Sequence, residues 1–318
     1  MLQAEAWGYD AAWSAEWLSN PFMPLSIAAK EAPCGFTLGT MAAYALGRSP
    51  MISAQIAWDL ARQTRGRFVL GLDADAPEFM DFGGDDQASV AIGKIREYLE
   101  SMRAIWRSFQ YDERLRYRGQ HYQFRLMAPF FNPGPIADPE IPIFLTGDGE
   151  EVYALAGELC QGLHAKALHS RSYLLDVVIP NLTRGLECSG RSRESFELAV
   201  PALVLTPDLL ERDIDSRDDA GRGIACYALT RINRAFARYH GWEELLDTLR
   251  RRARSVEGDA IWRSLPEEFL HEIAIVAEPE RAADALRHRY CGLVDRVCLV
   301  FAVWHPETIA AIVADLKQ

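Results

Sequence analysis

The chain has 318 residues, 49% of them hydrophobic and 25% charged, so it can bury a sizeable core. Its 34 basic and 45 acidic side chains give a net charge of -11, which opposes binding to nucleic acid and to anionic lipid surfaces. The apolar run Val297–Trp304 is far shorter than the roughly 20 residues of a membrane span, and no signal-peptide pattern opens the chain. These features predict a cytoplasmic protein that binds neither nucleic acid nor membrane.

Strand-like and helix-like segments alternate along most of the chain. This alternation is typical of βα units in a parallel sheet, and it leaves a (β/α)8 barrel and a doubly wound sheet as candidates. In chain order, strands are predicted at Ala11–Glu16, Phe36–Leu46, Phe68–Leu72, Ile141–Leu145, Gly162–Leu168, Leu198–Leu205 and Asp295–Val303. Helices are predicted at Met23–Glu31, from Ser49 onward, and at Ile92–Phe109, Glu150–Cys160, Ser172–Leu186 and Pro306–Leu316.

The helix that begins near residue 49 has the clearest local signals. Ser49 is a good cap and Pro50 suits the first helical turn. Ile52, Ile56, Leu60 and Ala61 then keep an apolar face at the helical period, and this face is expected to be the buried one.

Three further segments connect these elements. Tyr117–Leu126 is predicted to be a hairpin around Gly119. Pro129–Pro135 contains three prolines, which fix φ and remove amide donors, so we expect a rigid connector without regular structure. Thr206–Gly292 is helical by pattern and is predicted to be an insertion before the last strand. No repeat or flexible linker is evident, which favours a single domain over residues 1–318.

The cysteines are scattered and include no CxxC pair. This spacing favours core thiols over a zinc ribbon or a disulfide framework. The six are Cys34, Cys160, Cys188, Cys226, Cys291 and Cys298.

Four segments carry a family resemblance through their order and spacing. They are Ala4–Asp10 running into Trp13 and Glu16, Arg48–Met51 with Gly66–Leu72, Pro129–Pro135, and Gly157–His164. Together they resemble the luciferase-like monooxygenase superfamily, and within it the branch of oxidoreductases that use the deazaflavin coenzyme F420. The resemblance implies an α/β fold, the (β/α)8 TIM barrel, with F420 or FMN at the C-terminal ends of the strands. It also implies a small organic substrate and hydride chemistry supplied by the cofactor.

The first strand supplies two candidate residues under this resemblance. Glu16 matches a position where the family often presents a polar active-site residue, so it is a candidate catalytic proton donor. The alternative is a solvated loop carboxylate. Trp13 is a candidate for contact with the cofactor ring, and the alternative is an ordinary core aromatic.

The next two strands supply four candidate cofactor-binding residues. Thr40 and Met41 lie where family members place a backbone bulge behind the ring. Gly71 and Asp73 end the following strand, where relatives usually continue with an uncharged residue. Asp73 begins an acidic run that includes Asp75, and carboxylates beside a cofactor phosphate would weaken its binding.

Later strand ends supply the remaining candidates. Thr146 and Gly147 form a turn at a helix start, where a phosphate can bind, although the nearby acidic residues also suit ordinary helix capping. Lys166 and His169 are candidate cationic contacts for a phosphate, and His164 is a candidate catalytic residue. These histidines lack acidic or thiolate partners at ligand spacing, so no metal site is predicted.

Two departures from the family pattern keep a different function open. The acidic residues at the expected anion positions favour a cofactor-free, noncatalytic barrel that serves as a binding or partner subunit. In addition, Met1–Trp7 matches the family's first helix, so the family's first strand is apparently missing. Without it, Ala11–Ser14 and Val297–Val303 would have unpaired edges. We expect an upstream start, another part of this chain or a second subunit, as in a homodimer, to cover the gap.

Overall fold

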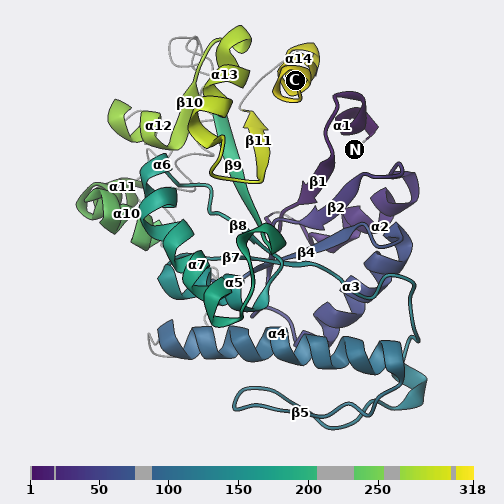
Figure 1. Ribbon diagram of the computed structural model, residues 1–318. Coiled ribbons are helices and arrows are strands. Elements are labelled where there is room, and N and C mark those ends of the chain that lie inside the picture. The colour runs from purple at the N-terminus through teal and green to yellow at the C-terminus, as the bar shows by residue number, and fades with distance from the viewer. Residues whose placement is uncertain (1, 18, 76–87, 206–232, 254–265, 302–305) are drawn as a thin grey trace.

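A curled parallel sheet with helices on its outer side forms the body of the protein (Figure 1). The computed structural model describes residues 2–17, 19–75, 88–205, 233–253, 266–301 and 306–318. In spatial order the main strands are β1 (Ala11–Ser14), β2 (Thr37–Thr40), β4 (Phe68–Asp73), β7 (Ile143–Thr146), β8 (Gly162–His164), β9 (Glu197–Leu205) and β11 (Arg296–Phe301). Every pairing among them is parallel, as the alternating sequence pattern predicts.

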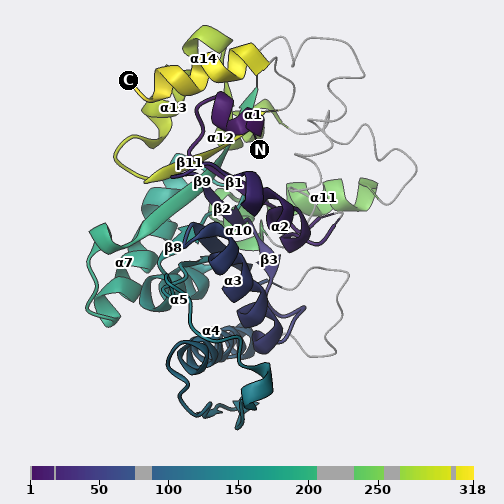
Figure 2. The same cartoon turned by 90° about the vertical axis from the view of Figure 1, so that its right-hand side faces the viewer.

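The helices between these strands pack side by side around the sheet (Figures 1 and 2). The larger apolar core fills the space between helices and sheet, as expected for a sheet whose strands are buried on both faces. The helices of this layer are α2 (Phe22–Glu31), α3 (Pro50–Thr64), α4 (Ala88–Tyr111), α5 (Glu150–Leu159), α7 (Ile179–Cys188), α13 (Pro279–Tyr290) and α14 (Pro306–Leu316).

Helix α3 begins as its sequence predicts. The Ser49 side chain accepts a hydrogen bond from the Ile52 amide at 3.3 Å, and Pro50 is the first helical residue. Ile52 itself is 48% exposed, so its predicted place on the buried face is wrong. Trp58 is fully buried and its indole donates to the carbonyl of Gly134, which holds the proline-rich connector against the helix.

The predicted hairpin is present, as β5 (Tyr117–Arg118) paired with β6 (Gln123–Phe124) in antiparallel fashion. The connector that follows differs from expectation at its start, because Pro129–Phe131 forms one 3-10 turn. Proline at the first position of that turn fits, since its missing amide would have no partner there.

A smaller apolar cluster fills the inside of the curled sheet. It comprises Val69, Phe144, Ala199 and Cys298, with Trp13 and Met41 packed against them. Gly39 makes room for this filling, because a Cβ on it would lie 2.3 Å from the Trp13 ring.

The structure corrects several predicted boundaries. The long strand predicted at Phe36–Leu46 is broken into β2 and the short β3 (Ala43–Tyr44), and the strand predicted at Gly162–Leu168 ends at His164. The segment predicted to be wholly helical contains β10 (Ala274–Val276), which pairs with β9. Its described helices are α10 (Arg234–His240), α11 (Glu243–Ala253), α12 (Glu267–Ile273) and α13, and residues 206–232 and 254–265 lie outside the described residues.

The cysteines are only partly core thiols. Cys160 and Cys298 are buried, whereas Cys34, Cys188 and Cys291 are exposed, so the prediction was wrong for these three. Cys226 lies outside the described residues.

The two edge strands of the sheet are not joined to each other. Among the described residues, β1 pairs only with β2 and β11 only with β9. On the outside of this seam, α1 (Leu2–Ala6) lies beside α14 in both views (Figures 1 and 2). Lys317 and Asp10 form an ion pair of 2.6 Å between these two ends of the chain. The termini therefore meet across the seam through side chains, while the strand edges stay unpaired within the described part of the chain.

No helix in the described part of the chain is long and apolar enough to cross a membrane.

Candidate active site

The C-terminal ends of the parallel strands bring most of the predicted site residues to one edge of the sheet. Glu16 follows β1, Asp73 ends β4, Thr146 ends β7 and Lys166 follows β8. Barrel enzymes place their chemistry at this edge because the loops there converge.

A break between β2 and β3 lies at the predicted bulge. Leu38 and Gly39 pair with the start of β4, and Ala43 pairs again with Leu72, so the backbone ladder skips the residues between them. The Thr40 hydroxyl replaces the missing ladder, because it donates to the Gly71 carbonyl at 2.7 Å and accepts from the Gly71 amide at 2.9 Å. A bulge is therefore present, as predicted.

Gly71 is required by this close approach. A Cβ at position 71 would lie 1.9 Å from the Thr40 carbonyl oxygen. Met41, which follows Thr40, packs against the cluster inside the sheet, and the Met41–Ala42 peptide is cis. Thr40, Met41, Ala42 and Gly71 thus form the bulge that the family resemblance places behind a cofactor ring.

Glu16 is held by two neighbours. Its carboxylate accepts two hydrogen bonds from the Arg48 guanidinium, at 2.7 and 2.5 Å, and one from the Tyr44 amide at 2.9 Å. Both side chains are about 15% exposed. Since both carboxylate oxygens already have donors, the geometry suits an anchor for the β3 end, and the proton-donor role remains a prediction.

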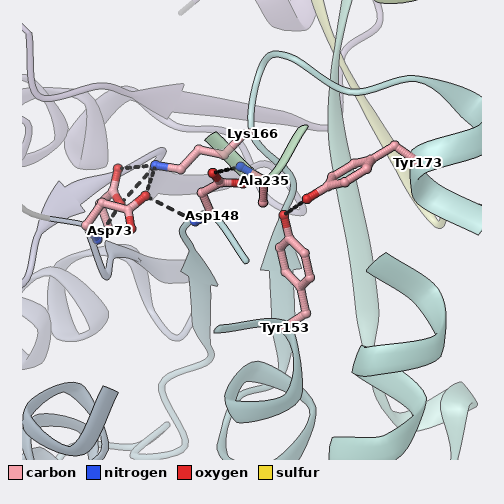
Figure 3. A network of polar contacts seen from close by, with 7 residues as sticks. Asp73, Asp148, Tyr153, Lys166, Tyr173 and Ala235 are labelled. Atoms are coloured by element: carbon pink, nitrogen blue, oxygen red, sulfur yellow. Dashed lines mark hydrogen bonds and ion pairs between the residues drawn. The ribbon is translucent and has the colours of Figure 1, made fainter. Parts of the chain in front are cut away.

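Lys166 sits in a cage of carboxylates (Figure 3). Its ammonium lies 3.0 and 2.9 Å from the two oxygens of Asp73 and 3.0 Å from Asp75. The Asp75 carboxylate also accepts the Asp148 amide at 3.1 Å, and the Asp148 carboxylate accepts the Ala235 amide of α10 at 2.7 Å. The cage thereby ties three strand ends to the helix α10.

Burial shapes the charges in this cage. It raises the pKa of Asp75 to about 7 and the pKa of Asp148 to about 6. Burial alone would lower the pKa of Lys166, but the carboxylates of Asp73 and Asp75 outweigh it and raise that pKa. Lys166 is therefore a charged, fully paired ammonium. Asp73 and Asp75 already bind its ammonium group, so the structure does not support Lys166 as a free cation for a phosphate.

His169 is also occupied by neighbours. Its Nδ1 lies 2.9 Å from the Lys166 carbonyl, so Nδ1 carries the proton and donates, and Nε2 accepts from the Tyr290 hydroxyl at 3.0 Å. Burial lowers the pKa of His169 to about 4. A neutral imidazole with both nitrogens paired leaves no donor for a phosphate, and it positions the turn before Ser170 instead. Ser170 caps the following helix by accepting from the Tyr173 amide.

His164 presents the opposite situation. It is 1% exposed, and neither of its ring nitrogens has a hydrogen-bond partner. Its ring packs edge-on against Trp13, with centroids 4.7 Å apart, and lies 5.0 Å from Phe144. Burial lowers the pKa of His164 to about 3, so the ring is neutral. Buried polar atoms without a protein partner are rare in folded proteins, so the two His164 nitrogens are available to hydrogen-bond a ligand or a water.

The turn after β7 is tightly packed. Thr146 is buried, and a Cβ on Gly147 would lie 2.8 Å from Val152 and 3.2 Å from Ala74. Gly147 thus serves close packing, while Glu150 and Glu151 fill the first turn of α5, where carboxylates favour the helix dipole. The ordinary capping interpretation fits this turn better than a phosphate cradle.

A cavity of about 520 Å³ opens at the other, N-terminal end of the strands. Its lining includes Trp13, Phe144, Arg67, Glu197 and Arg296. The Arg296 guanidinium lies over the Trp13 ring at 5.8 Å and pairs with Glu197. Trp13 therefore faces the inside of the sheet and this N-terminal cavity, which supports the core interpretation of that residue.

Sequence reasoning missed the partners that decide these roles. Arg48 was not connected with Glu16, and Tyr290 was not connected with His169. Both pairs join residues far apart in the chain, so only the fold shows them. One signal could have suggested the pair of Glu16 and Arg48. Both residues follow strands of the predicted sheet, and the ends of neighbouring parallel strands lie close together.

A deazaflavin or flavin fits one part of this site and not the other. The bulge at Thr40, the glycine at position 71 and the unpaired His164 suit an uncharged ring with polar edges. The cage around Lys166 does not suit a phosphate tail, because its carboxylates would repel it. The phosphate tail of the cofactor would therefore need hydrogen-bond donors other than Lys166.

Comparison with known proteins adds to this geometry. The pattern of the family described as luciferase-like monooxygenase matches residues 1–296. Uncharacterized protein Rv1360 of Mycobacterium tuberculosis is 32% identical over 320 residues, which cover 98% of this chain and 91% of the relative.

Two solved structures share the fold. An F420-dependent secondary alcohol dehydrogenase in complex with an F420-acetone adduct superposes with a TM-score of 0.73 at 16% identity, covering 99% of this chain and 93% of that one. The coenzyme F420 dependent tetrahydromethanopterin reductase from Methanopyrus kandleri gives a TM-score of 0.74 at 17% identity, covering 99% and 92%. The predicted α/β barrel class is confirmed.

Proposed function

The chain belongs to the luciferase-like monooxygenase family, and on that premise we propose that it transfers a hydride between coenzyme F420 and a small organic substrate. Both solved structures named above use F420, which favours the deazaflavin over FMN. The observation that carries the proposal is the buried His164, which ends β8 and whose two ring nitrogens have no hydrogen-bond partner among the described residues.

Each candidate residue has a role in this proposal. The bound cofactor would supply the hydride chemistry. Thr40, Met41 and Gly71 would support its ring through the bulge, and the neutral His164 would hydrogen-bond a substrate oxygen. Glu16 would keep Arg48 and the β3 end in place, or act as the proton donor.

A fluorescence titration tests the cofactor. F420 added to the purified protein should change the cofactor's fluorescence with a micromolar dissociation constant, on the order of -8 kcal/mol. FMN, titrated in parallel, should bind more weakly. Tighter binding of FMN would assign the protein to the flavin-dependent monooxygenases of the family instead.

A second candidate function is a cofactor-free barrel that acts as a binding or partner subunit. The caged Lys166 favours it, because this lysine follows the strand end where the resemblance expects an anion and is already paired with Asp73 and Asp75. No response to either cofactor would support this alternative. Assembly as a homodimer or with another subunit, and the cytoplasmic location, stay predictions that light scattering and cell fractionation can test.

A further inference from the structure

The cavity of about 520 Å³ at the N-terminal ends of the strands takes no part in the proposed function. Its volume lies within the range of small-molecule sites, roughly 300–1,000 Å³. Branched side chains usually fill the inside of a (β/α)8 barrel, but here two aromatic rings lie across glycines. A Cβ on Gly39 would lie 2.3 Å from the Trp13 ring, and a Cβ on Gly162 would lie 2.6 Å from the Phe144 ring. The two rings, with centroids 6.3 Å apart, therefore give the cavity an aromatic wall.

Arg67 lines the same cavity and carries a charge that no described carboxylate cancels. Its Nε donates to the Thr64 carbonyl at 2.8 Å, and its Nη1 donates to the carbonyls of Pro33 and Phe36, at 3.1 Å for Phe36. These carbonyls hold the guanidinium in place, but they are neutral. Its Nη2 has no hydrogen-bond partner among the residues that the structure describes. Arg67 is therefore a half-buried, positioned cation whose Nη2 can still bind an anion.

The other charged side chains around the cavity are paired or exposed. Arg296 forms an ion pair with Glu197, and Asp295 has an arginine partner of its own at 2.6 Å. Glu194 is exposed to solvent, where salt screens its charge. Within the described lining of the cavity, Arg67 is thus the cation that remains for a ligand, and it matches a single negative charge.

We propose that this cavity binds a small aromatic carboxylate, with the carboxylate group on Arg67 and the ring against Trp13 and Phe144. A guanidinium forms charge-assisted hydrogen bonds with a carboxylate of matching planar shape, and aromatic rings gain from packing against one another. The cavity lies at the opposite end of the strands from the candidate active site, so this binding does not depend on the proposed function.

The experiment compares phenylacetate with phenylacetamide, an uncharged ligand of nearly the same shape. Protein with ¹⁵N-labelled tryptophan is titrated with each ligand, and the indole signal of Trp13 is identified by its loss in Trp13→Phe. Phenylacetate should shift this signal. Its dissociation constant should be at least about tenfold lower than that of phenylacetamide, because only the carboxylate gains a charged hydrogen bond from Arg67.

Removing the charge at position 67 should abolish this preference. Arg67→Met keeps the apolar stem, so phenylacetate should bind it about as weakly as phenylacetamide does. Arg67→Lys keeps the charge without the planar fork, so its preference for phenylacetate should be smaller than that of the wild type. The matched control is Arg62→Met, since Arg62 is an exposed arginine on α3 that also donates to a backbone carbonyl, at 3.1 Å. This control should keep the wild-type preference.

Three outcomes would overturn the inference. They are equal dissociation constants of the two ligands in the wild type, a preference that persists in Arg67→Met, or no shift of the Trp13 signal with phenylacetate. Arg67 also ties several backbone carbonyls together, so thermal melts show first whether the Met variant folds. If it does not, Arg67→Lys takes its place, and a preference as large as that of the wild type would then contradict the contact with Arg67.

Discussion

Asp75 is the residue whose burial has the most direct consequence for stability. Its carboxyl group has a pKa of about 7 in the folded protein, against 3.8 for the ordinary group. Between these values the folded chain binds a proton that the unfolded chain does not, so this group's contribution to stability falls as pH rises toward about 7. Lys166, Asp73, Asp148 and Tyr44 are the charged or titratable groups around it.

Substituting Asp75→Asn should remove this pH dependence. Relative to the wild type, the variant should gain thermal stability between about pH 5 and about pH 8, since asparagine resembles the protonated acid. Thermal melts in a series of buffers measure this difference, with Asp59→Asn as the exposed control. If the difference in melting temperature between the variant and the wild type stays constant across the buffers, burial does not raise the pKa of Asp75 as assigned.

Glu16 and Arg48 provide a test that separates an anchor from a proton donor. If the pair is an anchor, Glu16→Gln and Arg48→Met should each destabilise the protein, and the double variant should reveal a coupling of about 1 kcal/mol. If Glu16 transfers a proton, Glu16→Gln should lower turnover about 10²-fold or more, while Arg48→Met should not. Denaturant unfolding and steady-state rates of the same three variants decide between the two roles.

At the scale of elements, Gly71 joins the bulge to β4. Its Ala variant would place a Cβ 1.9 Å from the Thr40 carbonyl oxygen, so Gly71→Ala should cost about 3 kcal/mol or more of unfolding free energy. Gly93→Ala is the matched control, because this glycine lies inside α4 with its nearest contact at 3.7 Å, and the change should stabilise the helix by up to about 1 kcal/mol. Similar unfolding free energies for the two variants would rule out the close approach.

The elements that sequence could predict are those set by local pattern. The cap at Ser49, the long helix over Ala88–Tyr111 and the hairpin at Tyr117–Phe124 follow from periodicity and turn residues. The break after Thr40 could be expected only through the family resemblance, because the Thr40 hydroxyl bonds the backbone of Gly71, 31 residues away in sequence, in place of the ladder.

The same limit applies to the candidate site. Asp73, Lys166 and His169 were all predicted as site residues, but their roles depend on which neighbours the fold gives them. Lys166 meets Asp73 across 93 residues of sequence, and His169 meets Tyr290 across 121. Residue type singled out these side chains at the strand ends, and long-range packing decided which of their donors and acceptors were already occupied.

For the molecule as a whole, the seam between β1 and β11 predicts uneven protection of the backbone. The carbonyls of Asp10 and Ser14 accept hydrogen bonds from the amides of Thr37 and Met41, so the amides of Ala11 and Trp13 point toward the seam. In hydrogen exchange they should exchange much faster than the Leu70 amide of β4, which donates to Pro142. Equal protection in dilute protein would show that the seam is closed, and protection that grows with concentration would show a second copy covering it.

We infer that coenzyme F420 binds at the C-terminal ends of the strands of this barrel. A crystal structure of the protein with F420 tests it most directly. The deazaflavin ring should lie against the bulge at Thr40 and Met41, near His164, and the cofactor's phosphate should lie away from the cage around Lys166. A ring bound instead in the N-terminal cavity beside Arg296, or a phosphate bound at Lys166, would contradict it.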